Sequence, residues 1–320
     1  MQSYRTFQSV DKCGALGGRV SPKAPRSVSL GGMIRGPDSP PATLPPVLRP
    51  LPGWARASAS LRETDLGDSA FLASAGLSVL DGIVRLAAAW AGVWRQRLAL
   101  SAAAASARMA GRREDEAALR DAWYLRRPDQ DPGPAGRILG AWRRLTRARG
   151  VLELVGEVFG LPDGLPERLA GLSKPPLTAA AEAATLVMAG SDQEMLALMV
   201  ADAVLAERLR WPVAVPLLAG QIAALKLGAV GRRPRPGDAD WLRSANLAYA
   251  RAAASACDLA AVIARRAETL QAVAPKLRAK GASRIGSMSD RASRRLFERL
   301  VRLGALRELS GRETFRLYGL

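Results

Sequence analysis

The sequence predicts an all-α helical body followed by a small C-terminal winged-helix-like module, made of one helix and a β-hairpin. Apolar residues recur at spacings of three and four from Asp65 onward, which is typical of helices that pack on a core. No alternating run of β-branched residues appears before residue 305. We therefore divide the chain into a Pro-rich arm (1–53), an all-α domain (54–275) and a basic winged-helix-like module (276–320).

The arm is distinguished by its proline content. Nine of the 21 prolines of the chain fall in residues 1–53, and proline removes backbone donors and blocks helix formation. This composition predicts a disordered or polyproline-like segment, with folded structure starting near Trp54.

The body shows a series of helical patterns separated by glycine and proline. Phe71, Leu77, Leu80 and Val84 mark the buried face of the first expected helix. Further helices are expected over 91–110, 114–125, 136–147, 151–159 and 177–189, with a loop at 129–134.

Helix-start signals predict two more helices in the second half of the body. Ser191 and Glu194 have the spacing of a capping box, which predicts a helix running to about Arg210. Asp238 or Asp240 is expected to cap the longest helix, which would end at Val273 before Pro275.

Composition excludes several kinds of site. The chain has no histidine and only two cysteines, Cys13 and Cys257, so histidine-based hydrolases, zinc clusters and disulfide scaffolds are excluded. No phosphate-binding loop or dinucleotide fingerprint occurs. We therefore expect no enzymatic activity and no cofactor, and we expect Cys257 to be a small buried apolar residue.

Acidic and aromatic residues in the body favour structural roles. Glu114, Asp115, Glu116 and Asp121 could bind a divalent cation, but acids in a first helical turn also complement the helix dipole, and Glu116 can pair with Arg120. We favour the structural interpretation. We also expect the tryptophans of the body to anchor the core, rather than to stack on bases: Trp90, Trp94, Trp123, Trp142, Trp211 and Trp241.

Hydropathy predicts a cytoplasmic protein without membrane contact. The longest uncharged apolar run, Trp211–Leu225, has 15 residues and is interrupted by two prolines, whereas a membrane-spanning helix needs about 20. The first 20 residues contain no continuous apolar stretch of the kind that a secretory signal requires.

Positive charge is concentrated at the C-terminus. The chain carries a formal net charge of +18, of which residues 276–320 contribute +8, from 12 basic and 4 acidic side chains. Such a block favours binding to phosphate groups. An arginine-rich solvated surface without a ligand would produce the same composition.

The segment after Ser289 predicts an amphipathic helix. Ser289 is placed to cap it, Gly304 to end it in a left-handed conformation, and Leu296, Phe297, Leu300, Val301 and Leu303 share one face. Five arginines lie on the opposite face: Arg291, Arg294, Arg295, Arg299 and Arg302.

A hairpin is expected to follow this helix. Extended runs at 305–309 and 313–318 flank Ser310-Gly311-Arg312, a three-residue connection of a common hairpin type. Phe315 and Leu317 would face the helix, whereas Arg316 and Tyr318 would face away, with Arg312 at the tip. A helix followed directly by a basic hairpin is typical of the second half of a winged helix-turn-helix.

These residues also carry a resemblance. The string Leu296–Leu320 resembles the winged-helix end of bacterial regulators, including those appended to Fic-type proteins. Together with 51–54 (LPGW), 115–121 (DEAALRD), 131–136 (DPGPAG) and 273–276 (VAPK), the chain resembles the bacterial domain of unknown function 1403 family over about residues 45–320. The resemblance implies an intracellular bacterial protein, often plasmid-associated, with no assigned substrate.

We expect the protein to bind double-stranded DNA, in a regulatory or plasmid-related role and with a possible homodimeric body. Arg291, Arg294 and Arg295 would contact base edges, and Arg299, Arg302, Arg312 and Arg316 would contact phosphates. The alternative is a helical adaptor whose basic tail docks on an acidic protein. One departure from the winged-helix pattern is that residues 276–288 leave room for a single short helix before the recognition helix.

Overall fold

The computed structural model describes residues 48, 50–56, 64–126, 129–148, 150, 164–191, 193–225, 233–279, 289–309 and 318–319. Within these residues, every helix precedes the two strands, so the body is all-α as predicted. The elements are η2 Gly53–Ala55, α1 Leu66–Arg85, α2 Ala91–Met109, α3 Glu116–Tyr124, α4 Gly133–Leu145, α6 Leu165–Ala170, α7 Pro176–Ser191, α8 Glu194–Arg208, α9 Leu218–Ile222, α10 Trp241–Ala279, α11 Asp290–Arg302, β1 Arg307–Glu308 and β2 Tyr318–Gly319.

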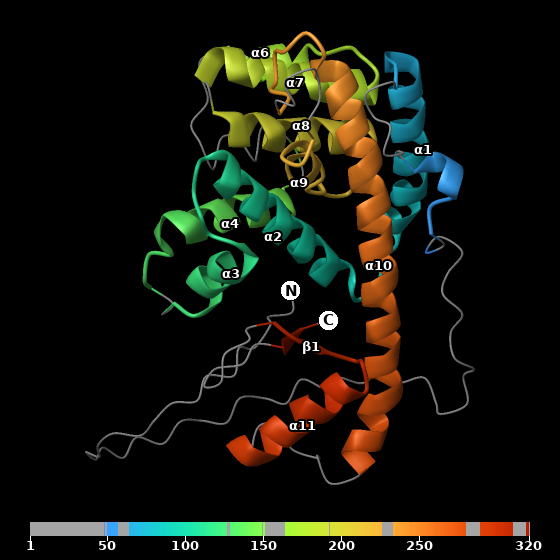
Figure 1. Cartoon of the computed structure of the whole chain (residues 1–320), viewed down its shortest axis with the longest axis vertical. Coiled ribbons are helices and arrows are strands. Elements are labelled where there is room, and N and C mark those ends of the chain that lie inside the picture. Colours follow the sequence, from blue (N-terminus) through green and yellow to red (C-terminus); the bar gives the residue numbers. More distant parts are fainter. Residues whose placement is uncertain are drawn as a thin grey trace, which may run out of the picture.

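The helix pair α1 and α10 forms one side of the body (Figure 1). α1 begins where predicted, because the Asp65 carboxylate accepts a hydrogen bond from the Asp68 amide at 2.7 Å. The two helices approach closely at Gly76, where a Cβ atom would lie only 3.0 Å from the Ala253 Cβ. Small residues at this crossing therefore set the distance between the helices.

The remaining helices pack against this pair and close the core. α7 and α8 lie together at one end, and α2, α3, α4 and α9 fill the middle (Figure 1). Tryptophan anchors hold these layers together, as predicted for Trp94, Trp142 and Trp241, which are 0%, 0% and 3% exposed. Their indole N–H groups donate to the Ala256 carbonyl, the Ser106 hydroxyl and the Ala181 carbonyl, respectively.

The predicted buried segment 211–225 lies in the core, with Trp211, Val215 and Leu218 buried. Cys257 is also buried, as predicted, and burial raises the pKa of its thiol to about 12. Phe71 differs from the prediction: it is 59% exposed, and its ring lies against the exposed Trp54 ring, with the ring centroids 6.0 Å apart. At 100° per residue, Phe71 lies opposite the buried positions of α1, such as Ala73 and Leu80, so its side chain faces away from the core.

The capping box predicted at residues 191–194 is wrong. Ser191 belongs to the last turn of α7, where its hydroxyl donates to the Val187 carbonyl at 3.0 Å. Gln193 is the N-cap of α8 and makes no side-chain capping bond, and Glu194 instead forms an ion pair with Arg233. The prediction failed because α7 extends to Ser191. The hydroxyl of Ser191 forms its hydrogen bond within α7 and is therefore not available to cap α8.

α10 differs from its predicted end. It continues as one helix of 39 residues to Ala279, passing through Pro275 rather than stopping at Val273. A proline inside a helix removes one backbone hydrogen bond but does not forbid the helix when the flanking turns remain bonded. The predicted helix 151–159 lies outside the described residues.

Two of the described helices are long and apolar enough to cross a membrane by length and composition alone: Leu66–Arg85, and Trp241–Ala272 within α10. In the most apolar stretch of each helix, 39% and 67% of the residues, respectively, are buried inside the molecule. The core helix of a globular protein has the same properties, so burial accounts for the composition of α10.

Packing of the body begins before Trp54. Leu48 and Leu51, both inside the predicted arm 1–53, are each 3% exposed. Arg56 then forms a bidentate ion pair with Asp258 of α10, with N–O distances of 2.8 and 3.0 Å. The start of folded structure predicted at Trp54 is therefore a few residues too late.

Candidate functional site

The C-terminal helix α11 has the boundaries that its sequence predicts. The Ser289 hydroxyl accepts from the Ala292 amide at 3.4 Å at its start. At its end, Gly304 has φ of 68°, a left-handed conformation that glycine adopts without a Cβ penalty. α11 lies beside the lower part of α10, next to the two short strands (Figure 1).

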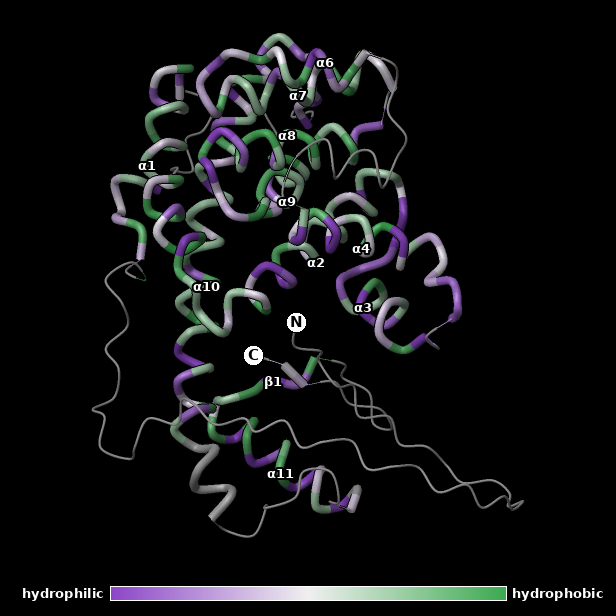
Figure 2. Tube along the Cα trace, turned by 180° about the vertical axis from the view of Figure 1, so that it is seen from behind, coloured by the Kyte–Doolittle hydropathy of each residue, from purple (hydrophilic) through white to green (hydrophobic). Residues whose placement is uncertain are grey.

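The arginine face of α11 is exposed. The five predicted residues Arg291, Arg294, Arg295, Arg299 and Arg302 are all exposed, and none forms an ion pair with any residue that the structure describes. Along α11, hydrophilic and hydrophobic residues alternate in short steps (Figure 2). The predicted Arg312 and Arg316 lie outside the described residues.

The opposite face of α11 packs on the strands. Leu300 is 6% exposed, and the Phe297 and Tyr318 rings stack with their centroids 4.7 Å apart. The prediction that Tyr318 faces away from the helix is therefore wrong. Leu303, which was expected on the apolar face, is 44% exposed.

The strands confirm an antiparallel pair near the C-terminus but not the predicted register. β1 pairs with β2 so that Arg307 faces Gly319 and Glu308 faces Tyr318. A three-residue connection at 310–312 would have placed Glu308 opposite Thr314 instead. The observed register brings Tyr318 onto Phe297, and this stacking contributes about 1 kcal/mol. The residues between Leu309 and Tyr318 are not described.

The element that precedes α11 is α10. Residues 280–288, where the sequence leaves room for one short helix, lie outside the described residues. The described part of the module is α11 with the two strands β1 and β2.

The acidic patch of the body is used structurally at three of its four positions. Asp115 caps α3 by accepting from the Ala118 amide at 2.8 Å, Glu114 pairs with Arg112, and Asp121 lies 3.8 Å from the guanidinium of Arg120. The predicted pair of Glu116 with Arg120 does not form. Across the described residues, no group of three or more acidic or thiol side chains could hold a metal ion.

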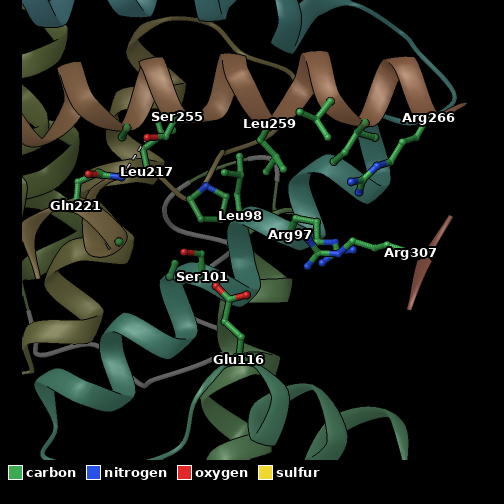
Figure 3. Close-up of a pocket in the computed structure, with 16 residues that line it drawn as sticks. Arg97, Leu98, Ser101, Glu116, Leu217, Gln221, Ser255, Leu259, Arg266 and Arg307 are labelled. Carbon is green, nitrogen blue, oxygen red and sulfur yellow. Dashed lines mark hydrogen bonds between the residues drawn. The ribbon is translucent and has the colours of Figure 1, made fainter. Parts of the chain in front are cut away.

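Glu116 instead lines a cavity that the sequence did not indicate. This cavity of about 280 Å³ lies between α2, α3, α9, α10 and β1. Figure 3 shows Arg97 and Arg307 pointing toward one another at one end, with Arg266 reaching in from α10. At the other end, the Gln221 amide donates to the Ser255 hydroxyl at 3.5 Å.

Electrostatics at this cavity are dominated by arginine. Burial, followed by the charge of Arg307, lowers the pKa of Arg97 to about 10, and Arg120 and Arg266 add to this effect. Glu116 acts in the opposite direction. Arg97 therefore remains charged at neutral pH, although like charges surround it.

A second buried group was also missed. Asp202 is 1% exposed in α8, and its carboxylate accepts hydrogen bonds from the Leu217 and Leu218 amides at 2.8 and 3.2 Å. Burial raises its pKa to about 7 despite these two bonds. The available signal was Asp202 itself, the one charged residue within the apolar run 195–206. No comparable signal links the cavity arginines, which are far apart in the chain.

Comparison with known proteins identifies the family. No curated protein and no solved structure matches the chain. The model of the family described as "Protein of unknown function (DUF1403)" matches residues 43–320. This match covers most of the chain, including the body, α11 and both strands. The chain therefore belongs to the DUF1403 family of proteins of unknown function.

Proposed function

We propose that the protein binds double-stranded DNA through α11, with the adjoining strands acting as the wing of a winged-helix-like module. The observation that carries this proposal is the exposed arginine face of α11. Its five guanidinium groups make no ion pair with the described residues, while the opposite face packs on β2. Such a surface is available to phosphate groups without first breaking internal contacts.

The dimensions of α11 suit a major groove. Its 13 residues span about 20 Å, and a major groove about 12 Å wide admits one α-helix. Arg291, Arg294 and Arg295 lie in its first half, from which recognition helices reach base edges. We assign Arg299 and Arg302, and from the sequence alone Arg312 and Arg316, to phosphates.

The test is the salt dependence of duplex binding. Replacing both Arg299 and Arg302, which we assign to phosphates, by Gln should weaken binding and reduce the slope of log K against log salt by about two units, because each phosphate contact contributes about 0.9. Fluorescence anisotropy with a labelled duplex at four salt concentrations measures the slope. The matched control removes the same charge from exposed positions in the body, Arg208→Gln with Arg265→Gln, and should change the slope little.

Removing the carboxylate on the arginine face should change duplex affinity in the opposite direction. Glu298 is exposed among the arginines, so Glu298→Gln should strengthen duplex binding. Equal slopes for the wild type and the α11 double variant would contradict the proposal. So would tight, stoichiometric capture of one acidic protein by a chain that shows no duplex affinity, which is the behaviour of an adaptor.

A further inference from the structure

The outer face of α1 is apolar but largely uncovered. Among the described elements, α1 packs mainly on α10 and η2, and 39% of the residues in its most apolar stretch are buried, against 67% in α10. α1 and η2 lie at one edge of the described structure in both views (Figures 1 and 2). The helix therefore has the composition of a core helix at a surface position, where the outer face of a helix is ordinarily polar.

The residues opposite the core form one strip along α1. No charged residue occurs between Asp68 and Asp81 in the sequence. The strip consists of one aromatic residue and several small ones: Phe71, Ser74, Ala75, Ser78 and Gly82. Depletion of charge together with a large aromatic side chain is typical of the centre of a protein–protein interface. It contrasts with the rest of this chain, whose net charge is +18.

Trp54 extends this apolar face. The η2 turn is fixed to the body, because Leu51 and Ala55 are buried against Ala254. Between them, Trp54 is 67% exposed and lies against the ring of Phe71. The turn thus buries its smaller side chains and leaves its largest ring in water. Tryptophan in such a position is a frequent anchor of protein–protein interfaces.

We propose that this face binds the same face of a second copy of the chain, so that two α1 helices pack antiparallel about a two-fold axis. α1 carries Asp68 near its N-terminal end and Arg85 at its C-terminal end. Antiparallel packing places each carboxylate beside the arginine of the other copy, whereas parallel packing would place like charges together. Asp68 forms no ion pair with any described residue. The side chain of Arg85 remains 48% exposed although it pairs with Asp81.

These charges also set the register of the two helices. When Asp68 lies opposite Arg85, the two-fold axis passes through the middle of α1. In the same register Phe71 faces Gly82, so the large ring meets a residue without a side chain. Serine and alanine occupy the crossing point, which allows the helices to approach closely. A membrane surface fits this face less well, because Asp65 and Asp68 at its edge would repel anionic headgroups.

Sedimentation equilibrium of the full chain tests the self-association. We expect the wild type to be mostly dimeric at about 10 µM chain. Ser78→Glu brings two carboxylates together near the axis and should weaken the dimer at least tenfold, and Phe71→Ser should do the same by removing the central ring. Ala118→Glu, which adds the same charge at an exposed position of α3, should leave the association unchanged. Unchanged thermal midpoints of the variants verify that they fold.

Oxidative cross-linking in a Cys13→Ser background tests the orientation. In the antiparallel pair, the two copies of Ser78 lie about 5 Å apart along the helix axis, and the two copies of Gly67 lie about 28 Å apart. Ser78→Cys should therefore form a disulfide between the copies, and Gly67→Cys should not. Efficient cross-linking through Gly67→Cys would indicate a parallel pair and contradict the proposed arrangement.

Three other results would overturn the proposal. They are a wild type that stays monomeric up to about 100 µM chain, a dimer that is unaffected by Ser78→Glu, and a monomeric wild type that floats with vesicles of phosphatidylcholine and phosphatidylglycerol (3:1) unless Phe71 is replaced. The last result would assign the face to a membrane. The interface uses no residue of α11, so loss of duplex binding in the α11 variants leaves these measurements unaffected, and the two proposals fail independently.

Discussion

At the residue scale, Asp202 shows how a buried carboxylate can organise backbone. The segment 211–217 is not helical, so the first amides of α9 need an acceptor inside the core. Asp202 supplies it, accepting from the Leu217 and Leu218 amides. The neighbouring Tyr249 is also buried, and its own burial raises the pKa of its hydroxyl well above the usual range. The charge of Asp202 raises this pKa further.

Asp202→Asn should remove a pH dependence from stability. The Asp202 pKa is about 7 in the folded protein and about 4 in the unfolded chain, so folding takes up a proton between these values. Wild-type stability should therefore fall by about 1.4 kcal/mol per pH unit as pH rises from 4 to 7, and then level off. The free energy of unfolding in urea, measured for wild type and variant from pH 4.5 to 8, gives the difference.

The control for this experiment is Asp131→Asn, which removes a carboxylate that is 64% exposed in its ion pair with Arg137. Its stability curve should run parallel to that of the wild type. A parallel curve for Asp202→Asn as well would show that Asp202 does not titrate in this range.

At the element scale, the sequence predicted helices wherever the deciding interaction is local. Ser289 caps α11 as predicted, and Asp65 and Asp115 cap α1 and α3 close to the helix starts that the sequence predicts, because each side chain bonds an amide three residues later. Predictions failed where a second element competes. Ser191 forms its hydrogen bond within α7 instead of capping α8. Tyr318 faces α11 because its ring stacks on the ring of Phe297.

The spacing between α1 and α10 can be tested at Gly76. Gly76→Leu should destabilise the protein by about 2 kcal/mol. The new Cβ atom would lie only 3.0 Å from the Ala253 Cβ, and the cost of overpacking this interface exceeds the free energy gained from the higher helix propensity of leucine. Gly92→Leu in α2 is the control, since nothing lies within 4 Å of a Cβ atom there. Thermal unfolding of the two variants compares them, and equal midpoints would contradict this packing.

At the scale of the whole molecule, the helical spacing of apolar residues was enough to predict an all-α body but not the contacts between its helices. The cavity could not be foreseen, because Arg97, Arg266 and Arg307 come from three elements and carry no motif. The burial of Leu48 and Leu51 could not be predicted either. These residues lie in a proline-rich segment without a helical spacing of apolar residues, so nothing in the sequence indicated that they contact the core.

Truncations test where the body begins. Removing residues 1–42, which precede the family match, should leave the thermal midpoint unchanged. Removing residues 1–57 also deletes Leu48, Leu51 and the Arg56–Asp258 ion pair, and should lower it by roughly 5–10 °C. Calorimetry of both truncated chains measures the difference, and equal midpoints would place the boundary after Arg56.

The passage of α10 through Pro275 predicts that the long helix is less stiff at this point than elsewhere. Pro275 has no amide hydrogen, so the Gln271 carbonyl cannot form its normal bond inside the helix, and bending costs less there than elsewhere along about 58 Å of rod. This point lies after Arg266 and before α11 in the chain. In the proposed DNA-binding role, a bend at Pro275 would move α11 relative to the duplex while residues 241–270 of α10, and the core that they hold, keep their positions.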